Sequence, residues 1–252
     1  MKKLFALLLS GLSVSGFSQT LEIGGRGGID SFWLLNSDKA KPGYSENYTL
    51  SMSYNGGLHL AYDITDNIGI ETNLMYASLS QSYSGNFSQT GVLTDGNLYL
   101  KGETFTSKTT LTATQIPLLA CLETNSGSFV ELGAEYDMIQ SANYTGSFSN
   151  PSANSNYSVT NYFSRSNISG VFGVGGKYSI NDYVFILTDF RLIYGFTDVK
   201  GVDGSGQAYN PTNTITGSFN IGIFYLLSLT PDYSVGHKCK GSPKVRSTRK
   251  HN

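Results

Sequence analysis

The amino-acid sequence predicts an all-β protein, a closed eight-stranded antiparallel transmembrane β-barrel with short periplasmic turns and long extracellular loops. Three observations predict this fold. The chain begins with a secretory signal, eight segments alternate between apolar and polar residues, and the connections between them alternate between long and short. The composition agrees, because abundant Gly, Tyr and Phe accompany a charged content of only 14%.

The predicted signal peptide covers residues 1–18. Two lysines precede a short apolar run that ends at Leu12, and the small residues that follow fit cleavage near Gln19. A transmembrane helix needs about 20 apolar residues, so this run is too short to be one. We therefore expect residues 19–230 to form a barrel in the outer membrane, followed by a basic, disordered periplasmic tail at residues 231–252.

Eight segments show the period-two alternation of β-strands. They are residues 19–35, 50–63, 67–83, 104–122, 128–143, 162–180, 183–196 and 213–229. Long polar connections are predicted at residues 36–49, 84–103, 144–161 and 197–212. Short turns are predicted at Ile64–Asp66, Glu123–Gly127 and Asn181–Asp182. Outer-membrane barrels show this alternation because their periplasmic turns are tight and their extracellular loops are free to lengthen.

Alternation within a segment separates a lipid-facing side from an interior side. In the segment 183–196, Phe190 and Leu192 share the apolar side, whereas Asp189 and Arg191 point the opposite way. The inward carboxylates predicted in this way are Glu22, Asp30, Glu71, Glu131, Glu135, Asp137 and Asp189, and the inward bases are Arg26, Lys177 and Arg191. Buried charges must be paired, hydrated or protonated, and eight strands leave little space for an open pore.

The charge of the chain is unevenly distributed. Residues 19–230 hold 9 basic and 17 acidic residues, a net charge of −8, whereas residues 231–252 hold 6 basic residues and one acidic residue. An acidic body argues against a nucleic-acid partner, because phosphate binding requires clustered Lys and Arg. The expected partners are outer-membrane lipids and other envelope proteins, and no small-molecule substrate is indicated.

The candidate chemical groups favour structure over catalysis. His59 is the only His in the predicted barrel, and its segment descends toward a short turn, away from an extracellular rim. A register that pairs Asp63 with Asn67 would place His59 opposite Glu71 inside the barrel. We therefore expect an interior pair of His59 and Glu71 rather than a catalytic histidine, and no enzymatic activity.

Clustered carboxylates raise the question of a metal site. Glu131, Glu135 and Asp137 lie close together in one segment, and hard cations take several oxygen ligands. The same pattern describes a polar lining of the interior, which is the interpretation that we favour. We accordingly expect no metal ligands and no cofactor-binding residues.

The two cysteines allow two interpretations. Cys121 lies at the predicted periplasmic edge of its segment, and Cys239 lies in the tail that leaves the last segment on the same side. In an oxidising compartment, a disulfide between Cys121 and Cys239 is one interpretation. The other is that Cys121 is a small apolar wall residue and that Cys239 is a free thiol in the tail.

Four stretches carry strand motifs in a fixed order: residues 54–80, Thr114–Glu123 (TQIPLLACLE), residues 170–198 and residues 221–227 (IGIFYLL). Together they resemble the PorT-like outer-membrane β-barrel domains of Bacteroidetes, over nearly all of residues 19–230. This resemblance implies the location and the fold of the chain. It implies no catalytic residue.

Three functions are consistent with the sequence. The first is an outer-membrane barrel with a structural or accessory role, which presents extracellular loops and a periplasmic tail to partners. The alternative is a component of a protein secretion or assembly machine in the outer membrane, which the resemblance alone supports. The second alternative is a soluble periplasmic β-sandwich that binds a ligand.

Overall fold

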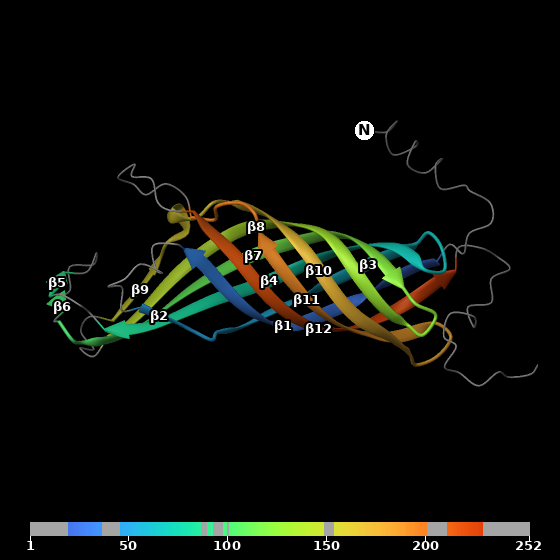
Figure 1. Ribbon diagram of the computed structural model, residues 1–252, viewed down its shortest axis with the longest axis horizontal. Coiled ribbons are helices and arrows are strands. Elements are labelled where there is room, and N and C mark those ends of the chain that lie inside the picture. Colours follow the sequence, from blue (N-terminus) through green and yellow to red (C-terminus); the bar gives the residue numbers. More distant parts are fainter. Residues whose placement is uncertain are drawn as a thin grey trace, which may run out of the picture.

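Eight long strands close a ring in the part of the chain that the structure describes (Figure 1). The computed structural model describes residues 20–36, 46–86, 90–92, 98–99, 101–148, 154–200 and 211–228, so the predicted signal peptide and tail lie outside the described residues. Each strand of the ring is antiparallel to its two neighbours, and the pairing of the first strand with the last closes the ring.

The ring consists of β1 (Thr20–Asn36), β3 (Met52–Asp63), β4 (Ile68–Asn86), β7 (Thr104–Glu123), β8 (Ser128–Phe148), β10 (Ser166–Ser179), β11 (Val184–Gly195) and β12 (Thr212–Ser228). The eight predicted segments match these strands, with shifts of at most five residues at their ends. The closed eight-stranded barrel is therefore confirmed. The β-sandwich alternative is wrong, because a sandwich needs two separate sheets that pack face to face.

The short connections lie at one end of the ring and the long connections at the other. Short turns at residues 64–67, 124–127 and 180–183 lie at the end where β1 begins and β12 ends, which we name the turn end. The longer connections lie at the opposite end, which we name the loop end. In the turn between β7 and β8, Gly127 has a φ of +85° and donates its N–H to the carbonyl of Thr124. A side chain at this position would be strained, so glycine suits the turn.

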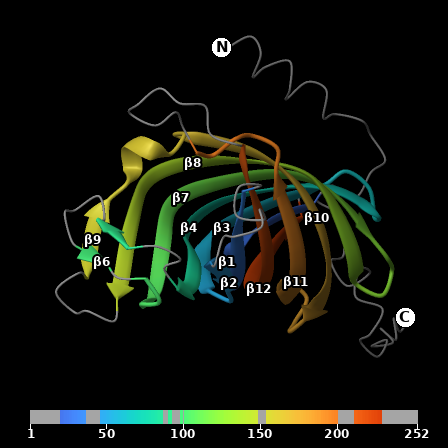
Figure 2. The ribbon, with the colours of Figure 1, turned by 60° about the vertical axis from the view of Figure 1, so that its left-hand side comes forward.

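At the loop end, β4, β7 and β8 extend beyond the ring and carry two additional strands. β2 (Glu46–Thr49) pairs with β4, and β9 (Ser155–Ser158) pairs with β8. The result is a curved sheet in the order β2, β4, β7, β8, β9, which we name the loop-end sheet (Figure 2). The sequence predicts polar loops in these regions because short, Ser-rich and Asn-rich strands show little apolar alternation.

Two small elements complete the described chain. β5 (Gly91–Val92) pairs with β6 (Leu98–Tyr99), and η3 (Thr160–Tyr162) is one 3-10 turn. Among the described residues, no helix is long and apolar enough to cross a membrane.

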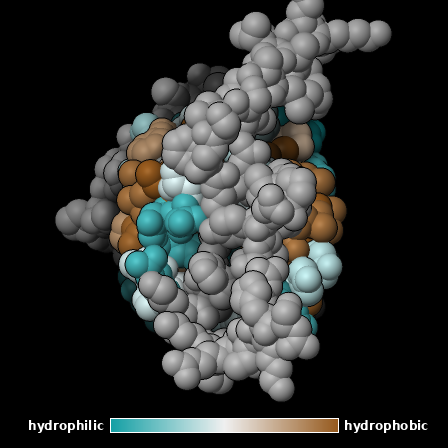
Figure 3. Space-filling model, turned by 90° about the vertical axis from the view of Figure 1, so that its right-hand side faces the viewer, coloured by the Kyte–Doolittle hydropathy of each residue, from teal (hydrophilic) through white to brown (hydrophobic). Residues whose placement is uncertain are grey.

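The wall of the ring has an apolar outer side and a polar inner side. In β11, Phe190 and Leu192 are 53% and 51% exposed, whereas Asp189 and Arg191 are buried. Viewed from the turn end, the flanks of the described wall are hydrophobic (Figure 3). Outward aromatic residues lie toward both ends of this apolar belt, as membrane barrels require. They are Tyr178, Tyr183 and Tyr225 toward the turn end, and Trp33, Tyr54, Tyr76, Tyr136 and Tyr194 toward the loop end.

The register of β3 and β4 differs from the predicted one. Asp63 pairs with Gly69 and not with Asn67, so the strands are offset by two residues from the prediction. The turn causes the offset, because the Thr65 hydroxyl accepts the N–H of Ile68 at 3.0 Å and holds that residue in the turn. An offset of two residues leaves every side chain on its predicted face. The predicted inner and outer faces of both strands are therefore unaffected.

The outer side of β7 offers a matched test of membrane residence. Leu118 is 62% exposed in the middle of the outward apolar belt, whereas Thr106 lies on the same side of β7 in the loop-end sheet. We expect Leu118→Arg to lower the free energy of unfolding by about 2–4 kcal/mol and Thr106→Arg to lower it by about 0–1 kcal/mol. Urea unfolding in lipid vesicles measures both values. Equal losses for the two variants would contradict a lipid-facing wall.

Candidate functional site

The barrel interior collects the ionisable side chains that the sequence predicts to point inward. Each of the seven predicted carboxylates and both arginines is at most 6% exposed. The side chain of Lys177 is 10% exposed. These groups lie in three layers along the axis of the barrel, which we name the turn-end, middle and upper layers.

In the turn-end layer, Lys177 joins two carboxylates. Its Nζ donates to Glu22 at 2.9 Å and to Glu123 at 2.7 Å. Asp63 accepts the hydroxyl of Thr20, and carboxylate oxygens of Glu22, Asp63 and Glu123 lie within 4.8 Å of one another. A metal ion fits such spacing, but the Lys177 ammonium already contacts two of these carboxylates. We therefore interpret the cluster as an ion pair that closes the turn end.

The middle layer is a network of two arginines and three carboxylates. Arg26 donates to Glu71 at 2.8 Å and also binds Asp189. Arg191 donates to the same Glu71 oxygen at 2.5 Å and forms two bonds with Glu131. These side chains come from β1, β4, β8 and β11, so the network links strands on different sides of the lumen. Removing one member would leave a buried charge without its partner.

A glycine on β10 gives the middle layer its space. Gly173 is paired with Glu131 on one side and with Arg191 on the other. A Cβ at Gly173 would overlap the Glu131 carboxylate, which meets Arg191 over the glycine. The same arrangement recurs at Gly24 on β1, which is paired with His59 on one side and Phe224 on the other. The rings of these two residues meet over the glycine, with 4.2 Å between their centroids.

His59 lies in the turn-end half of the barrel, as predicted, and is almost completely buried. It faces Asn73 directly, and its Nδ1 lies 2.8 Å from the Asn73 Oδ1. The predicted direct opposition of His59 and Glu71 is therefore wrong, because the turn shifts the register. The two side chains are still diagonal neighbours, with 3.6 Å between Nδ1 and the Glu71 Oε1. His59 Nε2 lies 4.0 Å from the Glu22 Oε2, and the His59 ring meets that of Phe224 edge-on.

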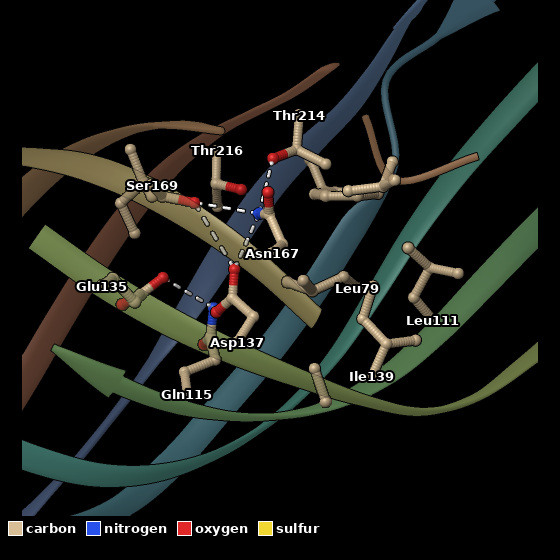
Figure 4. A pocket seen from close by; sticks show the side chains of 14 residues that line it. Leu79, Leu111, Gln115, Glu135, Asp137, Ile139, Asn167, Ser169, Thr214 and Thr216 are labelled. Carbon is tan, nitrogen blue, oxygen red and sulfur yellow. Dashed lines mark hydrogen bonds between the residues drawn. The ribbon is translucent and has the colours of Figure 1, made fainter. Parts of the chain in front are cut away.

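The upper layer holds carboxylates that are bound by amides (Figure 4). The Gln115 Nε2 donates to Glu135 at 3.1 Å and to Asp137 at 3.2 Å. Asn167 donates to the other oxygen of Asp137 at 2.9 Å. A cavity of about 10 Å³ lies between these polar groups and apolar side chains on the loop-end side. This volume is close to the minimum for one water molecule.

Apolar side chains close the interior at both ends. The loop-end apolar cluster consists of Phe32, Leu34, Ala77, Leu79, Leu111, Ile139, Ala142 and Val199. The turn-end apolar cluster consists of Cys121, Phe129, Phe185, Leu187, Phe224 and Leu226. A third buried apolar cluster consists of Leu119, Val171 and Ile193. Described side chains therefore occupy the interior at both ends and between them.

Cys121 belongs to the interior of the barrel. Its side chain is 7% exposed and packs in the turn-end apolar cluster. Cys239 lies outside the described residues, so the predicted disulfide between Cys121 and Cys239 stays a prediction.

Several members of the site are absent from the predicted set. Asp63 and Glu123 stand beside short turns, and Asn73, Gln115 and Asn167 are uncharged. Glu123 lies in a turn that the sequence predicts, and the other four occupy inward positions of predicted strands. The sequence signal that could have identified the strand residues among them is their period-two position on the inner face, and not their charge.

Comparison with known proteins connects this geometry to a family. A family model described as outer membrane protein beta-barrel domain matches residues 17–201. None of the curated proteins that were compared matches the chain.

Three solved structures are similar to the chain. Neisserial surface protein A is 12% identical, with a TM-score of 0.39, and the alignment covers 81% of this chain and 96% of that one. OprG from Pseudomonas aeruginosa is 15% identical, with a TM-score of 0.38 and coverages of 84% and 97%. Ail from Yersinia pestis is 11% identical, with a TM-score of 0.34 and coverages of 84% and 100%.

The middle layer yields a prediction about stability. We expect Arg191→Met to lower the free energy of unfolding by about 3–5 kcal/mol, because Glu71 and Glu131 lose a shared buried partner. The double variant Arg191→Met with Glu131→Gln removes one charge of each sign, so we expect a smaller loss. Urea unfolding of both proteins in the same vesicles gives the comparison. If the double variant is at least as unstable as the single one, the network does not act through charge pairing.

Proposed function

Because the chain belongs to the outer membrane protein β-barrel domain family, whose model matches residues 17–201, we propose that it has a structural or accessory role there. The protein is an eight-stranded barrel of the bacterial outer membrane. In the proposed role, the barrel anchors the loop-end sheet outside the cell and the basic tail in the periplasm. Lipids of the outer membrane and other envelope proteins are its proposed partners.

The filled interior is the observation that carries this proposal. Three apolar clusters and three polar layers occupy the lumen between the turn end and the loop end. The cavities described between them measure about 10 Å³ and about 20 Å³, which is room for single water molecules. A barrel filled in this way is suited to holding a surface in place and is poorly suited to conducting solutes.

The loop-end sheet supports the proposed contact role. Tyr157 on its edge strand β9 is 39% exposed, and its ring lies 5.2 Å from that of Tyr144. Tyr, Ser and Asn are the residues that adaptable protein contact surfaces use most, because Tyr supplies rigid area and the small residues supply hydrogen bonds. The sheet also keeps these residues on a rigid support.

We propose in addition that the protein is not an enzyme. His59 is the candidate base that the sequence offers, and it is buried beside Asn73 in the turn-end half. Its position is far from the exposed loop end, where an outer-membrane enzyme would meet its substrate. A general base must reach the proton that it abstracts, and this position does not favour that contact.

A role in protein secretion is the second candidate. It is supported by the resemblance to PorT-like domains, whose motifs fall on β3, β4, β7, β10, β11 and β12 of this barrel. Residues 114–123, for example, form the half of β7 that ends at the turn end. In this proposal, the loop-end sheet or the tail contacts the secretion machine.

Absence of a channel is the first test of the proposed function. We expect purified protein in a planar bilayer to give no steady conductance steps, because side chains fill the lumen. An open porin at the same ratio of protein to lipid is the positive control. Reproducible, ion-selective steps would contradict the proposed role of a closed anchor.

Site-specific cross-linking tests the contact surface. We expect a photoreactive amino acid at Tyr157 to yield cross-links to envelope proteins in whole cells. The matched position is Tyr178, which is 62% exposed on the lipid-facing side near the turn end and is expected to yield lipid adducts. A secretion component bound at Tyr157 would favour the second candidate. Equal protein yields at both positions would contradict a specific loop-end surface.

A further inference from the structure

A second cavity separates the middle layer from the upper layer. Its volume is about 20 Å³, and its lining includes Arg26, Asp30, Asn55, Glu135 and Arg191. Three buried atoms of these lining residues have no hydrogen-bond partner among the described residues: Arg26 Nε, Asp30 Oδ2 and Asn55 Oδ1. Their sister atoms are bonded, since Asn55 Nδ2 donates to Asp30 Oδ1 at 2.7 Å and the other Arg26 nitrogens bind Glu71 and Asp189.

Buried polar atoms without partners are costly, so three beside one cavity indicate that the cavity is occupied. The three atoms differ in kind, because Arg26 Nε–H is a donor whereas Asp30 Oδ2 and Asn55 Oδ1 are acceptors. A metal cation would face the Arg26 guanidinium, and an anion would face the Asp30 carboxylate. The occupant must therefore accept one hydrogen bond and donate two.

The volume of the cavity identifies its occupant. A cavity needs about 10–15 Å³ of space for water centres to hold one water molecule, and buried waters typically form about three hydrogen bonds. The volume of about 20 Å³ therefore fits one water molecule and is too small for an organic ligand. We propose that this cavity binds a single water molecule that accepts a hydrogen bond from Arg26 Nε and donates to Asp30 Oδ2 and Asn55 Oδ1.

The water molecule connects Arg26 of the middle layer to Asp30. Asp30 is 3% exposed and is bound by the Asn55 amide, whereas Arg26 belongs to the middle layer. Through the water molecule, Asp30 gains an indirect contact with a cation. The water molecule adds a second route from Arg26 to Asp30, beside the chain of hydrogen bonds that runs through Asp189, Asn220, Ser218 and Asn55.

Nuclear magnetic resonance of the ¹⁵N-labelled protein in detergent micelles tests this site. We expect the Arg26 Nε–H to show a direct cross-relaxation peak to water, with the sign of a long-lived bound molecule. Arg191, which also lines the cavity, is the internal control, because its Nε donates to Glu131 and should show a weaker peak than Arg26 Nε–H. Asn55→Leu should abolish the Arg26 peak. An absent Arg26 peak in the wild-type protein would overturn the proposal.

Two further measurements exclude other sources of the signal. Ser218→Ala removes a hydroxyl that lines the cavity and accepts a hydrogen bond from Asn55 Nδ2 at 3.2 Å. The Arg26 peak should persist in this variant, because Asn55 keeps its bond to Asp30, and its loss would overturn the proposal. A crystal structure at high resolution should show one density peak within hydrogen-bond distance of all three atoms. An anomalous signal at that peak in crystals grown with rubidium chloride would identify a cation and overturn the proposal.

Discussion

The structure depends on one constraint, which is that charged side chains on the membrane-spanning parts of the strands have only the lumen in which to lie. Hydrocarbon outside the wall excludes them, and the lumen of eight strands is only wide enough for side chains. Charges confined in this way must bind one another. Arg26 and Arg191 consequently share Glu71, and each also binds a carboxylate from β8 or β11.

The same confinement explains why glycine is frequent on the strands. Gly173 allows Glu131 and Arg191 to meet across β10, because a Cβ there would overlap the carboxylate. A glycine in a strand normally weakens it, but here the glycine provides volume that larger neighbours fill. The filled lumen in turn limits the functions open to the barrel. What the protein can offer to partners lies at its two ends and on its outer wall.

Much of this fold could be predicted from the sequence, because the membrane imposes a simple rule. The alternation of Phe190 and Leu192 with Asp189 and Arg191 identifies a strand and also its inner and outer faces. The register of β3 against β4 was less predictable. The hydroxyl of Thr65 determines where the turn ends, and no apolar pattern reports that hydrogen bond. Partners inside the lumen were least predictable, since they depend on how far strands are staggered around the ring.

The loop-end sheet also escaped sequence-based prediction, for a related reason. Outside the membrane, neither face of a strand has to be apolar, so the alternation that identifies strands in lipid disappears. β9 contains only Ser, Asn and Tyr, yet it pairs with β8 through regular backbone bonds. It pairs with the part of β8 that extends beyond the ring.

The most direct test of this account is the accessibility of spin labels along β11 in lipid vesicles. Labels at the outward positions Ile186, Phe190 and Tyr194 should relax strongly with oxygen, which concentrates in the bilayer. Labels at the inward positions Leu187 and Ile193 should be shielded from both oxygen and a water-soluble nickel chelate. A closed and filled barrel requires this alternation with a period of two residues. Access of the nickel chelate to the inward positions, or equal oxygen accessibility at all five, would contradict a closed and filled barrel.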